Sequence, residues 1–139
     1  MDAEKKRHRY KQPGYTFSEN QNPEKDLHGA MQYNLNGYWK SKLNQKLIFF
    51  TDYWVEFSVL TLCRIAYTLQ HKQIVSKCEA AKKILEILPY RNVISEALRI
   101  RERTKAKPLF KSIFSRQAAV KDFISHVIAG YGNQKSFEP

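Results

Sequence analysis

One segment constrains the fold of this 139-residue chain more than any other. It begins between Leu47 and Asp52, continues to about Gln70, and is apolar on nearly every side from Val55 to Leu69. A segment of this length and pattern predicts a helix, and a helix that is apolar all round must be buried. We therefore expect it to lie at the centre of an all-α domain, with the remaining helices packed around it.

Helix signals recur on both sides of this central segment. Asn22 and Pro23 form a typical helix start, because asparagine caps the first turn and proline fits the first helical position. Pro89 and Pro108 mark two helix ends, and Gly130 is placed to close the last helix. No strand pattern and no internal repeat is present, so we predict an all-α bundle of about five helices. The four outer helices are expected at residues 22–39, 77–88, 93–103 and 115–129.

Composition divides the chain into three regions. Residues 1–21 are polar and lack apolar periodicity, so we expect a mobile, disordered tail; a basic arm that touches RNA or a membrane is the alternative. Residues 22–130 are expected to form the helical bundle, and residues 131–139 a loose C-terminus. The chain has no apolar run long enough for a membrane span and no secretory signal, so we expect a cytoplasmic protein.

The net charge of +11 is concentrated in the second half of the chain. Residues 71–139 contain fourteen Lys and Arg against six Asp and Glu, and the basic residues are densest from Arg99 to Lys107. Such an excess attracts an anionic partner: nucleic acid, a nucleotide phosphate or an acidic protein face. The two cysteines, Cys63 and Cys78, and the four histidines lack metal-ligand spacing, so we expect free thiols and no metal site.

Lys77 is the first candidate for binding chemistry. Ser76 and Glu79 have the spacing of a capping box, which predicts that a helix begins at Lys77. The free backbone N–H groups of a helix start, its dipole and the lysine ammonium together favour a phosphate. The alternative is a lysine that simply lies in solvent.

The central helix carries a second group of candidates. Arg64 lies in its apolar middle, where it should meet a carboxylate, helix carbonyls or a ligand, and we expect a structural ion pair. Asp52 and Glu56 lie one turn apart at its start, and Tyr67 lies on the same face as Glu56. Acids beside aromatic side chains suit a cationic, sugar-like ligand, whereas stabilisation of the helix dipole is the alternative role of the two acids.

A different class of function fits the same helix. Arg64 and His71 match the arginine, six residues, histidine pattern of HEPN-type ribonucleases, in which histidine handles the proton and arginine the phosphate. That group usually has a polar residue after the arginine, and this chain has Ile65. A small basic RNA-binding protein or ribonuclease that also uses the basic run up to Lys111 is therefore one alternative, and an interaction module without chemistry is another.

A family resemblance is carried by the central helix and the helix start that follows it. The motif combines these pieces: Ser58-Val-Leu-Thr-Leu-Cys-Arg64, Tyr67, Ile74-Val-Ser-Lys77, Glu79-Ala-Ala and Leu88-Pro89. It resembles the C-terminal helical domain of the streptomycin/spectinomycin adenylyltransferases, over about 110 of the 139 residues. In that family this domain closes over ATP and the aminoglycoside, and the lysine of the Ser/Pro-Lys motif reaches the nucleotide phosphates. The resemblance gives that role to Lys77.

The resemblance also implies parts that this sequence lacks. In the family, a nucleotidyltransferase domain carries the magnesium carboxylates and the catalytic base. Such a centre needs a Gly-Ser turn and an Asp-x-Asp pair, and neither occurs in these residues. We therefore expect no catalytic residue, no metal ligand and no AMP transfer by the chain alone. ATP and Mg²⁺ would come with a separate or missing nucleotidyltransferase domain.

Two departures from the family pattern concern the antibiotic. Asp52 and Glu56 are out of register with the family's substrate-binding acids by about two residues, and Trp54 stands where the family often has an acid. The family's tryptophan after the small-residue pair is replaced by Lys82 or Lys83. An aminoglycoside is the substrate that the resemblance implies, but the sequence does not predict which one.

Overall fold

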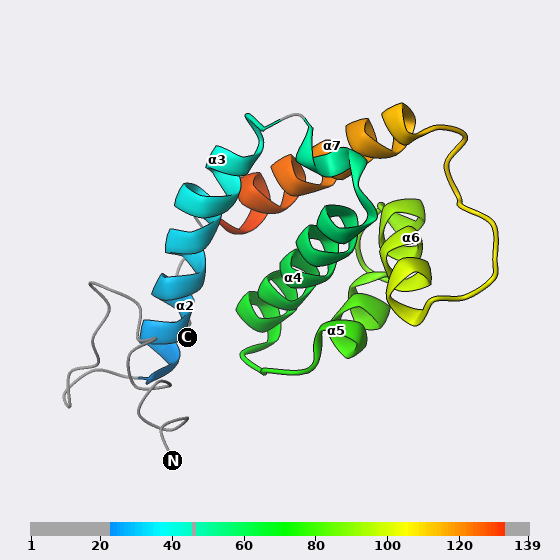
Figure 1. Cartoon of the computed structure of the whole chain (residues 1–139). Coiled ribbons are helices and arrows are strands. Elements are labelled where there is room, and N and C mark those ends of the chain that lie inside the picture. The colour runs from blue at the N-terminus through cyan, green and yellow to red at the C-terminus, as the bar shows by residue number, and fades with distance from the viewer. Residues whose placement is uncertain (1–22, 46, 133–139) are drawn as a thin grey trace, which may run out of the picture.

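A computed structural model describes residues 23–45 and 47–132 of the protein. These residues form helices joined by turns and contain no strand, so the predicted all-α fold is confirmed (Figure 1). The predicted tail at residues 1–21 and most of the predicted C-terminal segment lie outside the described residues. No helix in the described ranges is long and apolar enough to cross a membrane.

The helices follow one another with short connections. The first rod combines α2, a π-helical turn η1 and the short α3, and a 3-10 turn η2 then leads into the long α4. After α4 the chain forms α5, α6 and, beyond an extended connection, α7. In order, the bounds are α2 Pro23–Asn34, η1 Leu35–Trp39, α3 Lys40–Lys42, η2 Ile48–Phe50, α4 Asp52–His71, α5 Lys77–Ile84, α6 Arg91–Glu102 and α7 Ile113–Tyr131.

Helix α4 is the predicted central helix. Thr51 begins it, because this residue is extended and its side-chain oxygen accepts a hydrogen bond from the Trp54 N–H at 3.3 Å. The helix ends at Lys72, which adopts the left-handed conformation with a φ of 58°. Most of its length is buried, and it contacts α2, η2, α5, α6 and α7. The other helices therefore surround α4, as its apolar pattern predicts (Figure 1).

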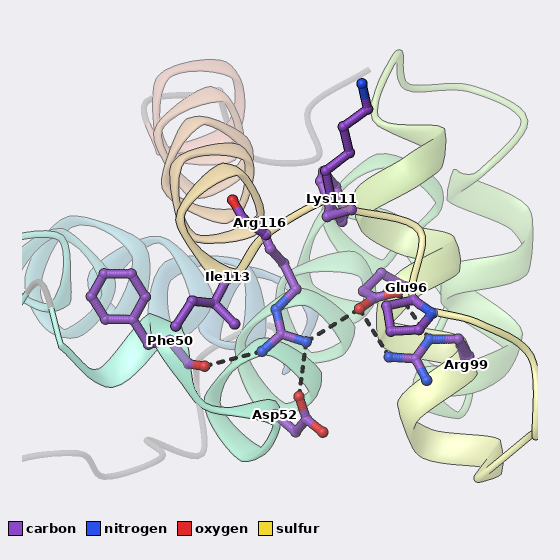
Figure 2. Close-up of a pocket in the computed structure, with 10 residues that line it drawn as sticks. Phe50, Asp52, Glu96, Arg99, Lys111, Ile113 and Arg116 are labelled. Carbon is purple, nitrogen blue, oxygen red and sulfur yellow. Dashed lines mark hydrogen bonds and ion pairs between the residues drawn. The ribbon is translucent and has the colours of Figure 1, made fainter.

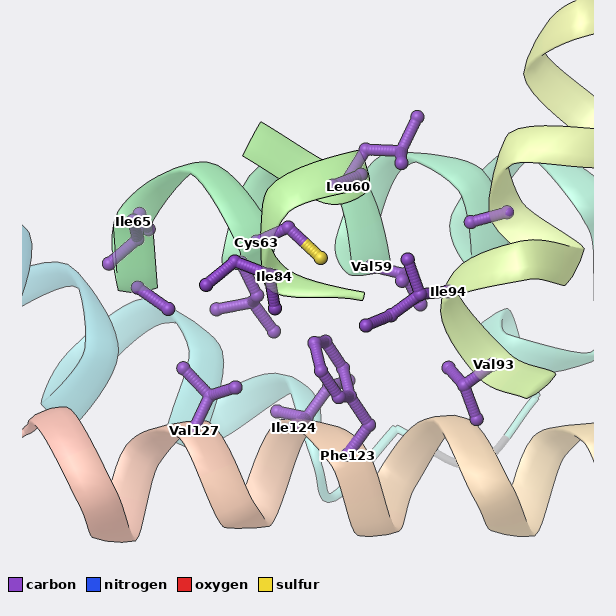
Figure 3. Close-up of a cluster of buried hydrophobic side chains, with 14 of the residues drawn as sticks. Val59, Leu60, Cys63, Ile65, Ile84, Val93, Ile94, Phe123, Ile124 and Val127 are labelled. Atoms are coloured by element: carbon purple, nitrogen blue, oxygen red, sulfur yellow. The ribbon is translucent and has the colours of Figure 1, made fainter. Parts of the chain in front are cut away.

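The core lies between α4 and α7. Figure 3 shows Phe123, Ile124 and Val127 of α7 pointing toward Cys63 of α4 and Ile84 of α5. All five side chains are fully buried. The apolar stripe of the last helix therefore faces the central helix, and burial of these large side chains is the main driving force for the fold.

Side-chain amides tie the first rod to the end of α7. Gln32 donates to the Tyr131 carbonyl at 3.0 Å, and Asn36 donates to the Gly132 carbonyl at 2.9 Å. These bonds satisfy carbonyl groups that the end of a helix leaves without partners. They join segments about a hundred residues apart in the sequence.

Two predicted helix ends were wrong. Helix α5 ends at Ile84 rather than near Leu88, because turns follow in which the Ile87 N–H bonds to the Ile84 carbonyl at 2.9 Å. Ile87 is consequently 47% exposed. Helix α7 continues through Gly130 to Tyr131, because this glycine keeps a helical conformation.

Candidate functional site

Lys77 is the first residue of α5. The Ser76 side chain accepts a hydrogen bond from the Glu79 N–H at 3.1 Å, which is one of the two bonds of a capping box. The described residues do not show the reciprocal bond from the Glu79 side chain. The capping serine places the Lys77 side chain at the positive end of the α5 dipole, half-buried.

Other cations surround the Lys77 ammonium. Burial lowers its pKa, and the neighbouring guanidinium groups of Arg64 and Arg101 lower it further, while Glu56 acts in the opposite direction. The Glu56 carboxylate already accepts a bond from Arg101 at 3.2 Å. The surroundings of Lys77 therefore have an excess of positive charge, which favours binding of an anion.

Arg64 does not meet the carboxylate that the sequence led us to expect. It is half-buried on α4, and among residues 23–45 and 47–132 no acidic side chain forms an ion pair with it. Its charge instead lies near that of Lys77. Of the partners considered for Arg64, a carboxylate of the described residues is therefore excluded.

The three candidates for substrate binding are held separately. Asp52 is exposed but pairs with Arg116 at 2.8 Å. Tyr67 is buried about four turns further along α4, and its hydroxyl donates to Gln73 at 3.3 Å. Glu56 pairs with Arg101, so neither Asp52 nor Glu56 is a free carboxylate that could bind a cationic ligand. Among the described cavities, Asp52 lines one and Tyr67 another, and none is lined by more than one of Asp52, Glu56 and Tyr67.

His71 lies at the last turn of α4, exposed, with its ring 4.4 Å from that of Tyr67. Both rings line a shallow cavity of about 300 Å³ together with Lys83. Arg64 lies two helical turns earlier, about 10 Å along the helix axis. The structure describes no contact between Arg64 and His71, the two residues of the ribonuclease pattern.

A group of aromatic side chains extends from Lys77 toward α3. The Lys77 ammonium lies 5.0 Å from the centre of the Phe57 ring. Phe57 is parallel to Tyr53, with ring centres 5.9 Å apart, and makes an edge contact with Trp54 at 5.5 Å. The Lys42 ammonium lies 5.3 Å from the Trp54 ring. The Tyr53 ring is also 5.8 Å from that of Trp54, so the three rings form a cluster, and the two lysines lie against different members of it.

The most strongly buried charges in the described residues were not predicted. Glu96 of α6 is fully buried and accepts hydrogen bonds from the side chains of Arg99 at 2.9 and 3.0 Å and Arg116 at 3.2 Å (Figure 2). The backbone N–H of Leu109 adds a further bond at 3.1 Å. Burial alone would raise the pKa of Glu96, but the bonds from Arg99, Leu109 and Arg116 outweigh it and lower the pKa to about 2.

Arg116 connects this buried carboxylate to the start of α4. Besides Glu96 and Asp52, it donates to the carbonyl of Phe50 at 3.0 Å (Figure 2). The group borders a cavity of about 460 Å³. The sequence held a signal for both residues, because Glu96 and Arg116 occupy positions on the apolar faces of their helices, where an unpaired charge is not tolerated.

The described residues do not fit a magnesium ion. They contain no group of three or more His, Cys, Asp or Glu side chains that could hold a metal. The carboxylates of Asp52, Glu56 and Glu96 are all paired with arginines. What the arrangement around Lys77 can do is bind an anion.

The fold and the site thus define an all-α bundle in which cationic side chains gather at the start of α5. A family model described as the C-terminal domain of aminoglycoside adenylyltransferase matches residues 20–129. The match covers well over half of the chain, so the protein belongs to this family, as its motifs indicated. Comparison with curated proteins and with solved structures gives no match.

Proposed function

We propose that this chain is the helical domain that binds the phosphates of ATP in an O-adenylyltransferase of the aminoglycoside type. Lys77 and Arg64 are the phosphate-binding residues. The observation that carries the proposal is Arg64, a half-buried guanidinium that has no carboxylate partner among the described residues and lies near the Lys77 ammonium.

A triphosphate is complementary in charge to this site. Phosphate oxygens accept bidentate hydrogen bonds from a guanidinium and a further bond from an ammonium, and the charge assistance makes these bonds strong. The first N–H groups of α5 add the positive end of the helix dipole. Besides burial, repulsion from Arg64 and Arg101 lowers the pKa of Lys77, and binding of an anion between the cations offsets that repulsion. Arg101 is close enough to add a third positive charge.

The chemistry of transfer is assigned to another domain. The described residues offer no group of side chains that could hold magnesium, and Asp52 and Glu56 at the start of α4 are both paired with arginines, so we assign to this domain the binding and orientation of ATP rather than activation of the acceptor hydroxyl. We therefore propose that the chain transfers AMP only together with a nucleotidyltransferase domain, which brings Mg²⁺. An aminoglycoside is the proposed acceptor, and a protein that uses ATP in this way belongs in the cytoplasm.

The test is ATP binding by isothermal titration calorimetry, with the chain alone and with an added nucleotidyltransferase domain. Lys77→Met should weaken binding at least tenfold, since one charge-assisted hydrogen bond contributes about 1.5–3 kcal/mol. Lys83→Met is the matched control, because Lys83 lies exposed at the far end of the same helix. Equal effects of the two variants would contradict the proposal.

A separate assay tests whether AMP transfer requires a nucleotidyltransferase domain in addition to this chain. The chain alone, incubated with ATP, Mg²⁺ and streptomycin or spectinomycin, should give no adenylylated product. Product formed by the chain alone would show that it contains a catalytic centre. Cleavage of a labelled RNA that is lost in His71→Ala would instead favour the ribonuclease function.

A further inference from the structure

The cluster of rings described above forms a surface that phosphate binding by Lys77 does not explain. We define the aromatic face as Tyr38, Tyr53, Trp54 and Phe57 with the two lysines that lie against these rings, Lys42 and Lys77. We propose that the aromatic face binds single-stranded nucleic acid, with bases stacked on the rings and phosphates at the lysines.

The exposure of the rings is the first reason. Tyr53 is 65% exposed and Tyr38 is 42% exposed, although both are large aromatic side chains that would lower the free energy of folding if buried. Tyr53 is nevertheless ordered by its parallel contact with Phe57, where the two ring planes differ by only 5°. A further flat ring can continue this stack, and nucleobases are flat rings that stack on tyrosine whatever their identity.

The charges on the aromatic face are the second reason. The Lys42 ammonium lies 4.9 Å from the Tyr38 ring and 5.3 Å from the Trp54 ring, while the Lys77 ammonium lies over the Phe57 ring. The two acids beside these rings are already paired, Asp52 with Arg116 and Glu56 with Arg101. A polyanion is therefore attracted to the face, and a polycationic antibiotic finds no free carboxylate on it.

The presence of two lysines on the face favours a strand over a free nucleotide. A nucleotide carries its phosphates on one side of its base, whereas a strand has a phosphate before and after each base. Lys42 lies against Trp54 and Lys77 against Phe57, so two separate ammonium groups are available for successive phosphates. A basic groove with stacked aromatic side chains is the usual arrangement for binding single strands without sequence preference.

The experiment is fluorescence anisotropy of a short fluorescein-labelled oligouridylate titrated with the full chain at low salt. Tyr53→Ala should weaken binding about tenfold, because it removes the most exposed stacking ring. Tyr33→Ala is the matched control: Tyr33 is 80% exposed on α2 and lies outside the aromatic face, so binding should not change. Lys42→Met should weaken binding and reduce its dependence on salt, because one phosphate contact is lost.

The outcomes separate this proposal from phosphate binding at Lys77. Tyr53→Ala should leave the ATP affinity of the chain unchanged, and streptomycin should not displace the oligonucleotide. Equal effects of Tyr53→Ala and Tyr33→Ala would overturn the proposal, as would no binding of the oligonucleotide. If Lys77→Met lost oligonucleotide binding and Tyr53→Ala did not, the oligonucleotide would bind through a phosphate alone. That result would overturn the proposal that bases stack on the rings. Loss of ATP binding in Lys77→Met would in each case still support the function of that lysine.

Discussion

Replacing Glu96 with glutamine keeps the size of a fully buried side chain but removes its charge. The folded protein holds the pKa of Glu96 at about 2, against 4.5 for a free glutamate side chain. Each unit of difference corresponds to about 1.4 kcal/mol, so the ionised carboxylate contributes about 3 kcal/mol to stability at neutral pH. We expect Glu96→Gln to lower the free energy of unfolding by about 2–3 kcal/mol. Glu96→Ala should cost about 3–5 kcal/mol, because it leaves the buried Arg116 with only the exposed Asp52 as a counter-ion.

The same shift predicts how this contribution depends on pH. Because folding lowers the pKa of Glu96, its contribution is complete above pH 4.5 and is lost as the pH falls toward 2. At pH 3 about 2 kcal/mol of the contribution should be gone. The difference in stability between the wild type and Glu96→Gln should therefore shrink by that amount between pH 7 and pH 3.

Urea unfolding followed by circular dichroism at pH 7 and pH 3 measures this difference. Glu86→Gln is the matched control, because Glu86 is exposed and should change stability by less than about 0.5 kcal/mol. If Glu96→Gln resembled Glu86→Gln, the buried carboxylate would not stabilise the fold. If the difference between wild type and Glu96→Gln did not change with pH, the assigned pKa would be wrong.

Three further predictions concern local features. Thr51→Ala should destabilise the fold by about 1 kcal/mol in urea unfolding, because the Trp54 N–H loses its capping oxygen; an unchanged midpoint would argue against this cap. Arg103→Gly should stabilise the fold by about 0.5–1 kcal/mol in the same assay, because Arg103 has a φ of 52° that glycine adopts without strain; a loss of stability would show that the arginine side chain matters more. A thiol reagent should modify Cys78 in the folded protein and Cys63 only after unfolding, since Cys63 is buried and burial raises its pKa; rapid modification of both thiols would contradict the described core.

Local sequence signals predicted the helices well, for physical reasons. The all-round apolar pattern from Val55 to Leu69 can only be satisfied inside a bundle, and Ser76 identified the start of α5 because a capping bond spans three residues. Helix ends were less accurate. The stop at Ile84 rather than Leu88 depends on a competition between turns and helix before Pro89, which the pattern alone does not decide.

Contacts between residues far apart in the sequence could not be predicted from the sequence pattern. The ion pair of Glu96 and Arg116 joins residues twenty positions apart, and the bond from Arg116 to the Phe50 carbonyl spans sixty-six. Each requires the packing of α6 and α7 on the start of α4. The same packing forms the ion pair of Asp52 with Arg116, so this carboxylate is not available to a ligand. The position of Arg64 in an apolar helix predicted an ion pair. The sequence alone could not show which charged residues lie near it in the fold.

The central claim is that ATP phosphates bind between Lys77 and Arg64, and it is tested most directly by nuclear magnetic resonance. The ¹⁵N-labelled chain would be titrated with ATP while backbone amides and arginine side chains are observed. We predict that the largest shifts occur at the amides of residues 77–80 and at the Arg64 Nε, and that Lys77→Met abolishes both. Shifts confined to the basic run from Arg99 to Lys111, or unchanged in Lys77→Met, would contradict the claim.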